Sequence, residues 1–232
     1  MTNLKKPPIF CAIDKPDPDA AIKLCEEIAP LGIGIKLGLE FFNALGLAGL
    51  KEIEKKFPDV PIFVDLKYHD IPNTVAGAVR AVTKDFKPAY LNVHASGGLE
   101  MMRAARDACP PETKLLAVTL LTSLDENAIH EIGYKDHLSE RVIQLAKLTE
   151  KAGLDGVVCS SHEIHDIRLN CGNEFVLMVP GIRPGGSDTA DQKRVMSPRD
   201  AMDVGATHLV IGRPITQAAS PRKAAEEILG TL

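Results

Sequence analysis

Short apolar runs rich in β-branched residues recur along the whole chain, and segments with a different periodicity separate them. The runs are IFCAID (9–14), GIKLG (34–38), PIFVDLK (61–67), YLNVH (90–94), LLAVTLL (115–121), GVVCS (156–160), EFVLMVP (174–180) and HLVIGRP (208–214). Between them, apolar residues recur at three- and four-residue intervals, most clearly in 18–29, 97–109, 139–152 and 221–230. The runs predict strands, and the spaced segments predict amphipathic helices.

Strands that alternate with helices predict parallel βαβ units. Eight such units in a chain of 232 residues match the size of an α/β protein of the (β/α)8 or TIM-barrel type. An open, doubly wound sheet is the alternative, but its GxGxxG fingerprint is missing because the first run ends in IDKPDPD. No linker or shift in composition divides the chain, so we expect residues 1–232 to form a single barrel domain.

Composition narrows the possible partners. Hydrophobic residues make up 45% of the chain, but aromatic residues only 4%, which predicts a mainly aliphatic core. The net charge is −4 and no basic run occurs, so a nucleic-acid partner is not expected.

The five cysteines have irregular spacing and no CxxC, which indicates reduced, buried thiols. No apolar stretch has the length of a secretory signal or a membrane span, so we expect a cytoplasmic protein.

Polar residues stand at or just after the end of nearly every predicted strand. In barrels of this kind, the active site lies at the carboxyl ends of the strands. These residues therefore predict a ring of functional groups around one mouth. They are Asp14, Lys36, Asp65, Lys67, His94, Thr119, Thr122, Ser123, Ser160, Gly181, Arg183, Gly212 and Arg213.

The segment FVDLKYHDIPNTV, residues 63–75, is the most unusual of these strand ends. Side chains alternate along a strand, so Asp65 and Lys67 should share the interior face, and Asp70 should follow where the chain leaves the strand. Pro72 should hold Ile71 in an extended conformation, and Asn73 or Thr74 could cap the next helix. The charges could form a purely structural ion pair, or carboxylates could hold Lys67 protonated as a proton donor; the strand-end context favours the second interpretation.

A second group follows the seventh predicted strand, in GIRPGGSDTADQKRV (181–195). Its glycines permit close backbone approach to a ligand, and Arg183, Gln192 and Arg194 can donate hydrogen bonds. Such a loop is often only a polar surface loop. Gly212 and Arg213, however, follow the eighth strand, and barrels frequently bind phosphate after strands seven and eight. Because arginine donates two parallel hydrogen bonds to phosphate, we expect a phosphate-binding site here.

Histidines and cysteines offer weaker candidates. His162 and His165 form an HxxH pair, but no third ligand or HExxH pattern accompanies them, so a solvent-facing helix start is expected and no metal site. Cys11 and Cys159 lie in apolar runs and should pack as small hydrophobic residues. His94 could face the mouth of the barrel or be a hydrogen-bonded core residue.

DLKYHDIPNT (65–74), GIRPGG with the following DQ (181–192) and IGRPI (211–215) closely resemble orotidine 5′-phosphate decarboxylases. AIDKPD, GIKLGLEFF and AVTLLTS extend the resemblance over nearly the whole chain. The resemblance implies a homodimeric (β/α)8 barrel that uses no metal and no organic cofactor. It also implies the decarboxylation of orotidine 5′-phosphate to UMP and CO2 in pyrimidine biosynthesis.

The resemblance also implies residue roles. Lys67 would protonate C6 of the pyrimidine, Asp65 would sit against the substrate carboxylate, and Lys36 would link Asp65 to the ribose. Asp70 and Thr74 would reach into the partner's site. The remaining substrate-binding residues would be Asp14 at a ribose hydroxyl, Thr122 and Ser123 at the pyrimidine amide, Pro180, and Arg183, Gln192, Gly212 and Arg213 around the phosphate.

Two other functions compete with this one. Metal-dependent sugar-phosphate enzymes, such as 3-keto-gulonate phosphate decarboxylases and hexulose phosphate synthases, share the DxKxxD pattern. They typically lack the HDIPNT continuation and the long loop at 181–195. A non-catalytic barrel that senses nucleotides is the second alternative, but a sensor has no need of a protonated lysine beside two acids.

Overall fold

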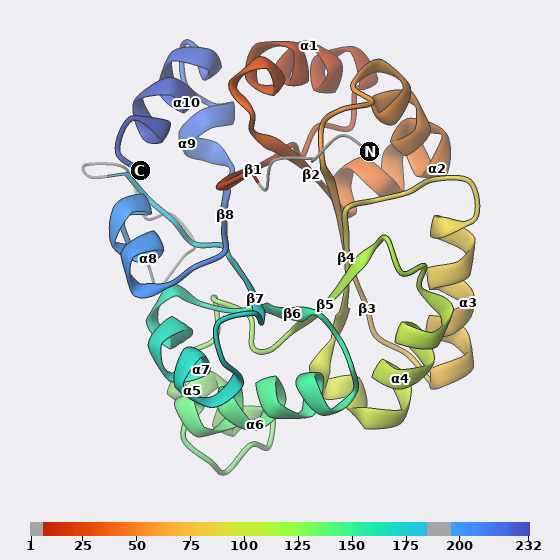
Figure 1. Cartoon of the computed structure of the whole chain (residues 1–232), viewed down its shortest axis with the longest axis vertical. Coiled ribbons are helices and arrows are strands. Elements are labelled where there is room, and N and C mark those ends of the chain that lie inside the picture. Colours follow the sequence, from red (N-terminus) through yellow and green to blue (C-terminus); the bar gives the residue numbers. More distant parts are fainter. Residues whose placement is uncertain (1–6, 185–195) are drawn as a thin grey trace.

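The computed structural model describes residues 7–184 and 196–232. Eight parallel strands close into a barrel in sequence order, with β8 pairing β1 (Figure 1). Their bounds are β1 Ile9–Ala12, β2 Gly34–Gly38, β3 Ile62–Tyr68, β4 Tyr90–His94, β5 Lys114–Val118, β6 Gly156–Val158, β7 Val176–Val179 and β8 His208–Ile211. The predicted (β/α)8 barrel is confirmed, and the open sheet is wrong.

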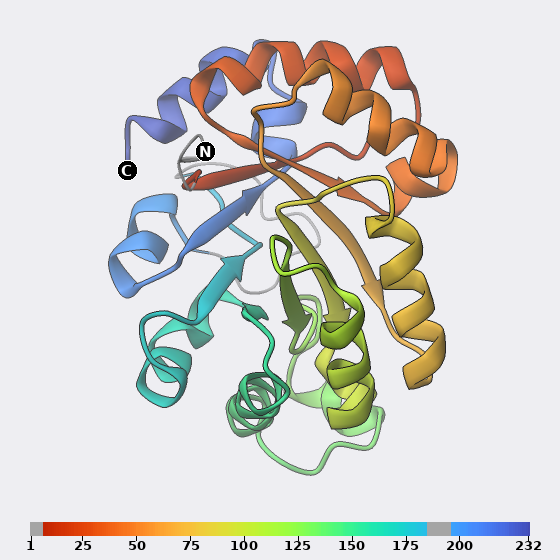
Figure 2. The same cartoon turned by 45° about the vertical axis from the view of Figure 1, so that its right-hand side comes forward.

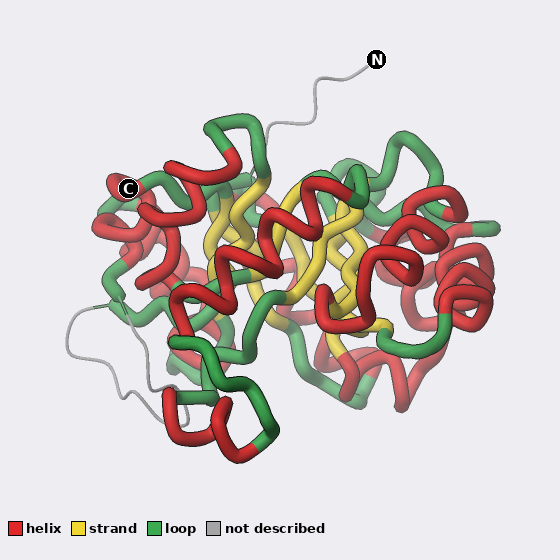
Figure 3. Tube along the Cα trace, turned by 90° about the horizontal axis from the view of Figure 1, so that it is seen from below, coloured by secondary structure: helices red, strands yellow, loops and turns green. Residues whose placement is uncertain are grey.

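Helices surround the strands and cover their outer faces (Figures 2 and 3). Their bounds are α1 Pro18–Ile28, α2 Leu39–Lys56, α3 Pro72–Thr83, α4 Gly98–Ala108, α5 Glu126–Glu131, α6 Leu138–Lys151, α7 Ile164–Cys171, α8 Pro198–Val204, α9 Arg213–Thr216 and α10 Pro221–Leu229. Short 3-10 turns occur at Ala29–Leu31, Ala95–Gly97 and Ser161–Glu163. Among the described residues, no helix is long and apolar enough to cross a membrane.

The helix after β3 begins earlier than expected. Neither Asn73 nor Thr74 caps α3, which starts at Pro72. Proline suits the first helical position because its fixed φ is already helical and it has no N–H to leave unpaired. Ile71, held extended at ψ 155° as predicted, precedes it without a side-chain cap. The capping prediction is therefore wrong, whereas the predicted effect of Pro72 is confirmed.

Side chains of alternating strand residues fill the barrel interior. The main apolar core lies between the strands and the helices, and a separate cluster lies inside the barrel around Phe10, Phe63 and Tyr90. Gly34 makes room for this cluster, since a Cβ there would lie 2.5 Å from the ring of Phe10. The interior is therefore a packed core below the mouth.

Strand β3 departs from regular geometry where its charged residues lie. Val64 pairs with Leu91 and Tyr68 with Val93, so three residues of β3 oppose the single residue Asn92 of β4. Within this bulge, Lys67 has φ +53°, and it is the only non-glycine residue among those described with a positive φ. Bulges of this kind re-aim side chains, and a left-handed lysine must be held in place by its surroundings.

Candidate active site

A cavity of about 180 Å3 opens at the carboxyl ends of the strands. Phe63 and Val210 belong to its apolar lining, and the charged residues Asp65 and Lys67 also line it. Thr122, from the loop after β5, and Pro180, directly after β7, line it as well. Ser123 is exposed in the same loop as Thr122 and is not among the residues that line the cavity. An apolar pocket with a few convergent polar groups is the usual form of a small-molecule site.

Four charged side chains from three neighbouring strands meet beside this cavity. Lys67 Nζ lies 2.6 Å from Asp65 Oδ1, and Lys36 Nζ lies 3.2 Å from Asp65 Oδ2. Lys36 Nζ is also 3.4 Å from Asp14 Oδ1, just beyond β1. Gly38 permits this approach, because a Cβ there would lie 2.8 Å from Lys36 Nζ. The sequence predicted that these residues share a mouth, and the structure brings all four together.

Mutual pairing fixes the charges of this cluster. Burial alone would raise the pKa of Asp65, but Lys36, Lys67 and a hydrogen bond from Asn92 lower it to about 2. Burial would likewise lower the pKa of Lys36, and the carboxylates of Asp65 and Asp14 outweigh it and raise that pKa. Asp65 is therefore ionised and Lys36 protonated at neutral pH.

Asn92 is a member of the site that the sequence analysis missed. It is fully buried in β4, and its Nδ2 donates to Asp65 Oδ1 at 2.7 Å. Its Oδ1 accepts a hydrogen bond of 2.8 Å from the backbone N–H of Lys67. A single asparagine inside the apolar run YLNVH was the available signal, because a buried amide must find partners.

His94 ends β4 at the mouth and lies against His69, with 5.4 Å between the ring centroids. Partial burial, together with nearby His69 and Lys67, lowers the pKa of His94 to about 4. His94 is therefore a half-buried residue at the carboxyl end of β4 with a neutral ring at physiological pH, and it does not line the cavity itself.

Asp70 and Thr74 lie outside the cluster within one chain. Both are exposed, and Asp70 Oδ1 accepts from the N–H of Ile71 at 2.6 Å. Among the described residues, Asp65 is the only carboxylate that pairs with Lys67. Of the two acids expected to flank this lysine, the chain itself therefore supplies one.

The candidate phosphate residues lie after two adjacent strands. Gly181 and Arg183 follow β7, whose neighbour β8 leads directly into Gly212 and Arg213 at the start of α9. The N–H of Arg183 donates to the carbonyl of Met196 at 3.0 Å, which ties the two described ends of this loop together. Gln192 and Arg194 lie outside the described residues.

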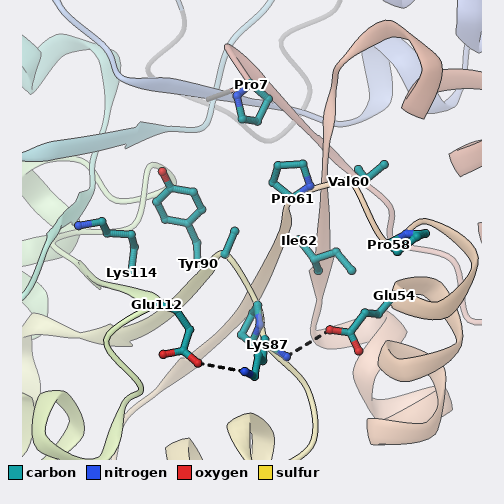
Figure 4. A pocket seen from close by; sticks show the side chains of 12 residues that line it. Pro7, Glu54, Pro58, Val60, Pro61, Ile62, Lys87, Tyr90, Glu112 and Lys114 are labelled. Carbon is teal, nitrogen blue, oxygen red and sulfur yellow. Dashed lines mark hydrogen bonds and ion pairs between the residues drawn. The ribbon is translucent and has the colours of Figure 1, made fainter. Parts of the chain in front are cut away.

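A larger hollow of about 450 Å3 lies at the other end of the barrel, between segments that precede the strands (Figure 4). Pro7, Pro58 and Pro61 form much of its wall, and the two lysines of its rim pair with carboxylates. Lys87 Nζ lies 3.4 Å from Glu112, and Lys114 Nζ lies 2.7 Å from Asp155. No charged group is buried there as Asp65 and Lys36 are at the mouth.

The remaining candidates are structural. His162, in the 3-10 turn before α7, and His165, at the start of α7, are both exposed, as expected. Cys11 and Cys159 are buried thiols, and burial raises the pKa of Cys11. Within residues 7–184 and 196–232, no group of three or more histidine, cysteine or acidic side chains could hold a metal ion.

The fold and the position of the charged cavity define the chain as an enzyme of the (β/α)8-barrel class. A sequence profile of the orotidine 5′-phosphate decarboxylase / HUMPS family matches residues 7–228. The chain therefore belongs to this family.

Similar proteins span the same length. The orotidine 5′-phosphate decarboxylase of Rhodospirillum rubrum is 48% identical over 240 aligned residues, which cover 100% of this chain and 96% of the relative. That of Idiomarina loihiensis is 46% identical, with 97% and 98% covered. The crystal structure of orotidine 5′-phosphate decarboxylase from Lactobacillus acidophilus superposes with a TM-score of 0.84 at 33% identity, covering 97% of this chain and 98% of that one.

Proposed function

We propose that this chain decarboxylates orotidine 5′-phosphate to UMP and CO2 in pyrimidine biosynthesis, with Lys67 as the proton donor. The observation that carries the proposal is the 2.6 Å ion pair between Lys67 and Asp65 in the wall of the cavity. Membership of the family and relatives of this name over the full length support it.

The chemistry asks for such a pair. Loss of CO2 from the substrate leaves an electron pair on C6 of the pyrimidine, and no cofactor is proposed to delocalise it. A fixed ammonium group at that carbon stabilises the developing charge and then supplies the proton. Asp65 keeps the lysine in place, and it lies against the leaving carboxylate in the proposed arrangement. The carbon–carbon bond breaks, CO2 departs, and the proton of Lys67 forms the new C6–H bond.

The rest of the site binds the nucleotide. Asp14 and Lys36 serve the ribose, Thr122 and Ser123 the edge of the pyrimidine, and Pro180 the wall of the pocket. Phosphate binding falls to Arg183, Gln192, Gly212 and Arg213. Binding energy from the phosphate, remote from the reacting carbon, would help to position the base for the reaction.

The proposal includes a homodimer in the cytoplasm. Asp70 and Thr74 are exposed just beyond β3. In the proposed dimer they reach the partner's site, where Asp70 supplies the second acid beside Lys67.

The test is the loss of orotidine 5′-phosphate absorbance with purified protein, in the presence and absence of EDTA. We expect turnover that the chelator leaves unchanged, with UMP as the product. Absent turnover, or turnover that requires an added divalent ion, would instead favour the metal-dependent sugar-phosphate enzymes of the same family.

A further inference from the structure

Strand β3 carries two more residues than β4 between its flanking ladder pairs. Asp65, Leu66 and Lys67 lie between the pairs Val64–Leu91 and Tyr68–Val93, and Asn92 alone faces them. Backbone groups inside such a bulge lose their regular partners. A buried N–H without a partner costs about 1–3 kcal/mol, so another group must replace the ladder.

The side chain of Asn92 fills this gap. Its Oδ1 accepts from the N–H of Lys67 at 2.8 Å, and this is the residue with φ +53°. Left-handed conformation is unfavourable for a lysine and persists only where the surroundings enforce it. The amide oxygen therefore helps to hold the backbone that aims the ammonium group.

The other end of the same amide acts on the carboxylate. Asn92 Nδ2 donates to Asp65 Oδ1, the oxygen that also receives Lys67 Nζ, while Oδ2 faces Lys36. Asp65 Oδ1 thus has two partners, the Asn92 amide and Lys67, and Oδ2 has Lys36. This arrangement needs a side chain with both a donor and an acceptor, which asparagine has and aspartate or leucine lacks.

We infer that Asn92 is a positioning residue for the reaction: its amide joins the bulged backbone of Lys67 to the carboxylate of Asp65 and fixes the distance between the two charges. This inference rests on the proposed role of Lys67. Asn92 does not line the cavity itself. Its effect is therefore on the turnover step through Lys67 and Asp65, and not on nucleotide binding.

The sharpest test is Asn92→Asp. Its ionised carboxylate still accepts from the N–H of Lys67, but its second oxygen repels Asp65 where an N–H donated before. Two neighbouring carboxylates share a proton readily, so acid should protonate the new side chain and restore the donor. We expect kcat of this variant, as a ratio to wild type, to rise at least about tenfold from pH 8 to pH 5.

The charged surroundings support this assignment of the pH effect. Position 92 faces Asp65 and Lys67 of β3, with Lys36 of β2 beyond Asp65. On the other side its ladder partner in β5 is the apolar Leu116. His94, two residues along β4, interacts with Asp65, Lys67 and His69, and its own titration near pH 4 is common to both proteins. The ratio to wild type removes that shared contribution.

Asn92→Leu removes both hydrogen bonds, and we expect kcat to fall about 10- to 100-fold with KM changed less than about threefold. Thr113→Val is the matched control. Thr113 is also buried, and its hydroxyl bonds the carbonyl of Pro88 at 2.8 Å at the opposite end of the barrel. It should lose a buried hydrogen bond and some stability, but keep wild-type kcat at every pH.

Two results would overturn the inference and leave the proposed function standing. One is a ratio of kcat, Asn92→Asp to wild type, that does not change with pH. The other is that both Asn92 variants have the kcat of Thr113→Val. If Asn92→Leu does not fold, the pH ratio of Asn92→Asp still decides, because acid rescue is read within one soluble protein. Wild-type protein without decarboxylase activity would instead overturn the proposed function and this inference with it.

Discussion

The two ends of the barrel interior bury polar groups in opposite ways. At the amino end, the hydroxyl of Tyr90 lies 2.7 Å from His208 Nε2, and His208 Nδ1 donates to the carbonyl of Pro7. The rings of Phe10 and Phe63 pack edge-on around this pair. Burial raises the pKa of Tyr90 to about 12, so its hydroxyl stays protonated at neutral pH. The buried polar groups at this end are uncharged, hydrogen-bonded to one another and surrounded by aromatic rings.

At the carboxyl end, the same strands carry ionised side chains into a cavity. Lys36 and Asp65 are buried there with 7% and 8% exposure, although desolvation opposes the charged form of each. Buried ion pairs seldom add net stability compared with apolar residues. The comparison therefore teaches that the amino end serves stability and the carboxyl end serves chemistry, as the barrel class in general divides them.

The largest expected effect comes from Lys67→Ala. We expect turnover to fall by at least about 10³-fold, because both the proton and the stabilising charge are lost. Binding of UMP should persist, since the phosphate residues lie after other strands. Steady-state kinetics and calorimetric titration with UMP measure the two effects. Lys114→Ala, at the amino end, is the control, and substantial activity in Lys67→Ala would refute the proton-donor role.

A smaller effect is expected from Arg213→Ala. Loss of one charged contact to phosphate should weaken UMP binding about 10- to 100-fold, since such bonds contribute about 1.5–3 kcal/mol. Binding of uridine, which has no phosphate, should be nearly unchanged. Arg222→Ala, whose guanidinium pairs with Glu226 on α10, is the matched control. Equal losses for nucleotide and nucleoside would remove Arg213 from the phosphate site.

The smallest effect on activity should come from Tyr90→Phe at the amino end. The change removes the hydroxyl that bonds His208 and should lower the free energy of unfolding by about 1–2 kcal/mol. We expect kcat to stay within about twofold of wild type, because the site lies at the other end of the strands. Urea-induced unfolding measures the change in the free energy of unfolding, and the decarboxylase assay on the folded variant measures kcat. A large loss of kcat in a folded variant would contradict the division between the two ends.

The fold and most of the site could be predicted from the sequence. Periodicity gave strands such as 34–38 and 90–94 with their observed bounds. Their positions at strand ends predicted that Asp14, Lys36, Asp65 and Lys67 lie at one mouth, and the structure places them together. These predictions succeed because hydrophobic patterning and the carboxyl-end rule depend on local sequence and a shared architecture.

What the sequence did not reveal depends on register between strands. Alternation predicted that Asp65 and Lys67 share the interior face, and both line the cavity there, but through a bulge with a left-handed lysine and not through a regular strand. The role of Asn92 follows from that bulge, so it needed the pairing of β3 with β4. Helix α3 began at Pro72, because the fixed φ of proline suits the first helical position and no side-chain cap is needed there.

Closure of the barrel has a consequence for how the enzyme assembles. The charged cluster comes from β1 to β3, whereas the proposed phosphate residues follow β7 and β8. The pairing of β1 with β8 joins these two groups of strands directly, through pairs such as Ile9 with Leu209 and Cys11 with Ile211. Contacts between residues so far apart in sequence form slowly, because closing the long intervening loop costs chain entropy. A partly folded chain can therefore form the charged cluster before it can bind a nucleotide. The pairing of β1 with β8 is the folding step that brings the charged cluster and the proposed phosphate residues into one site.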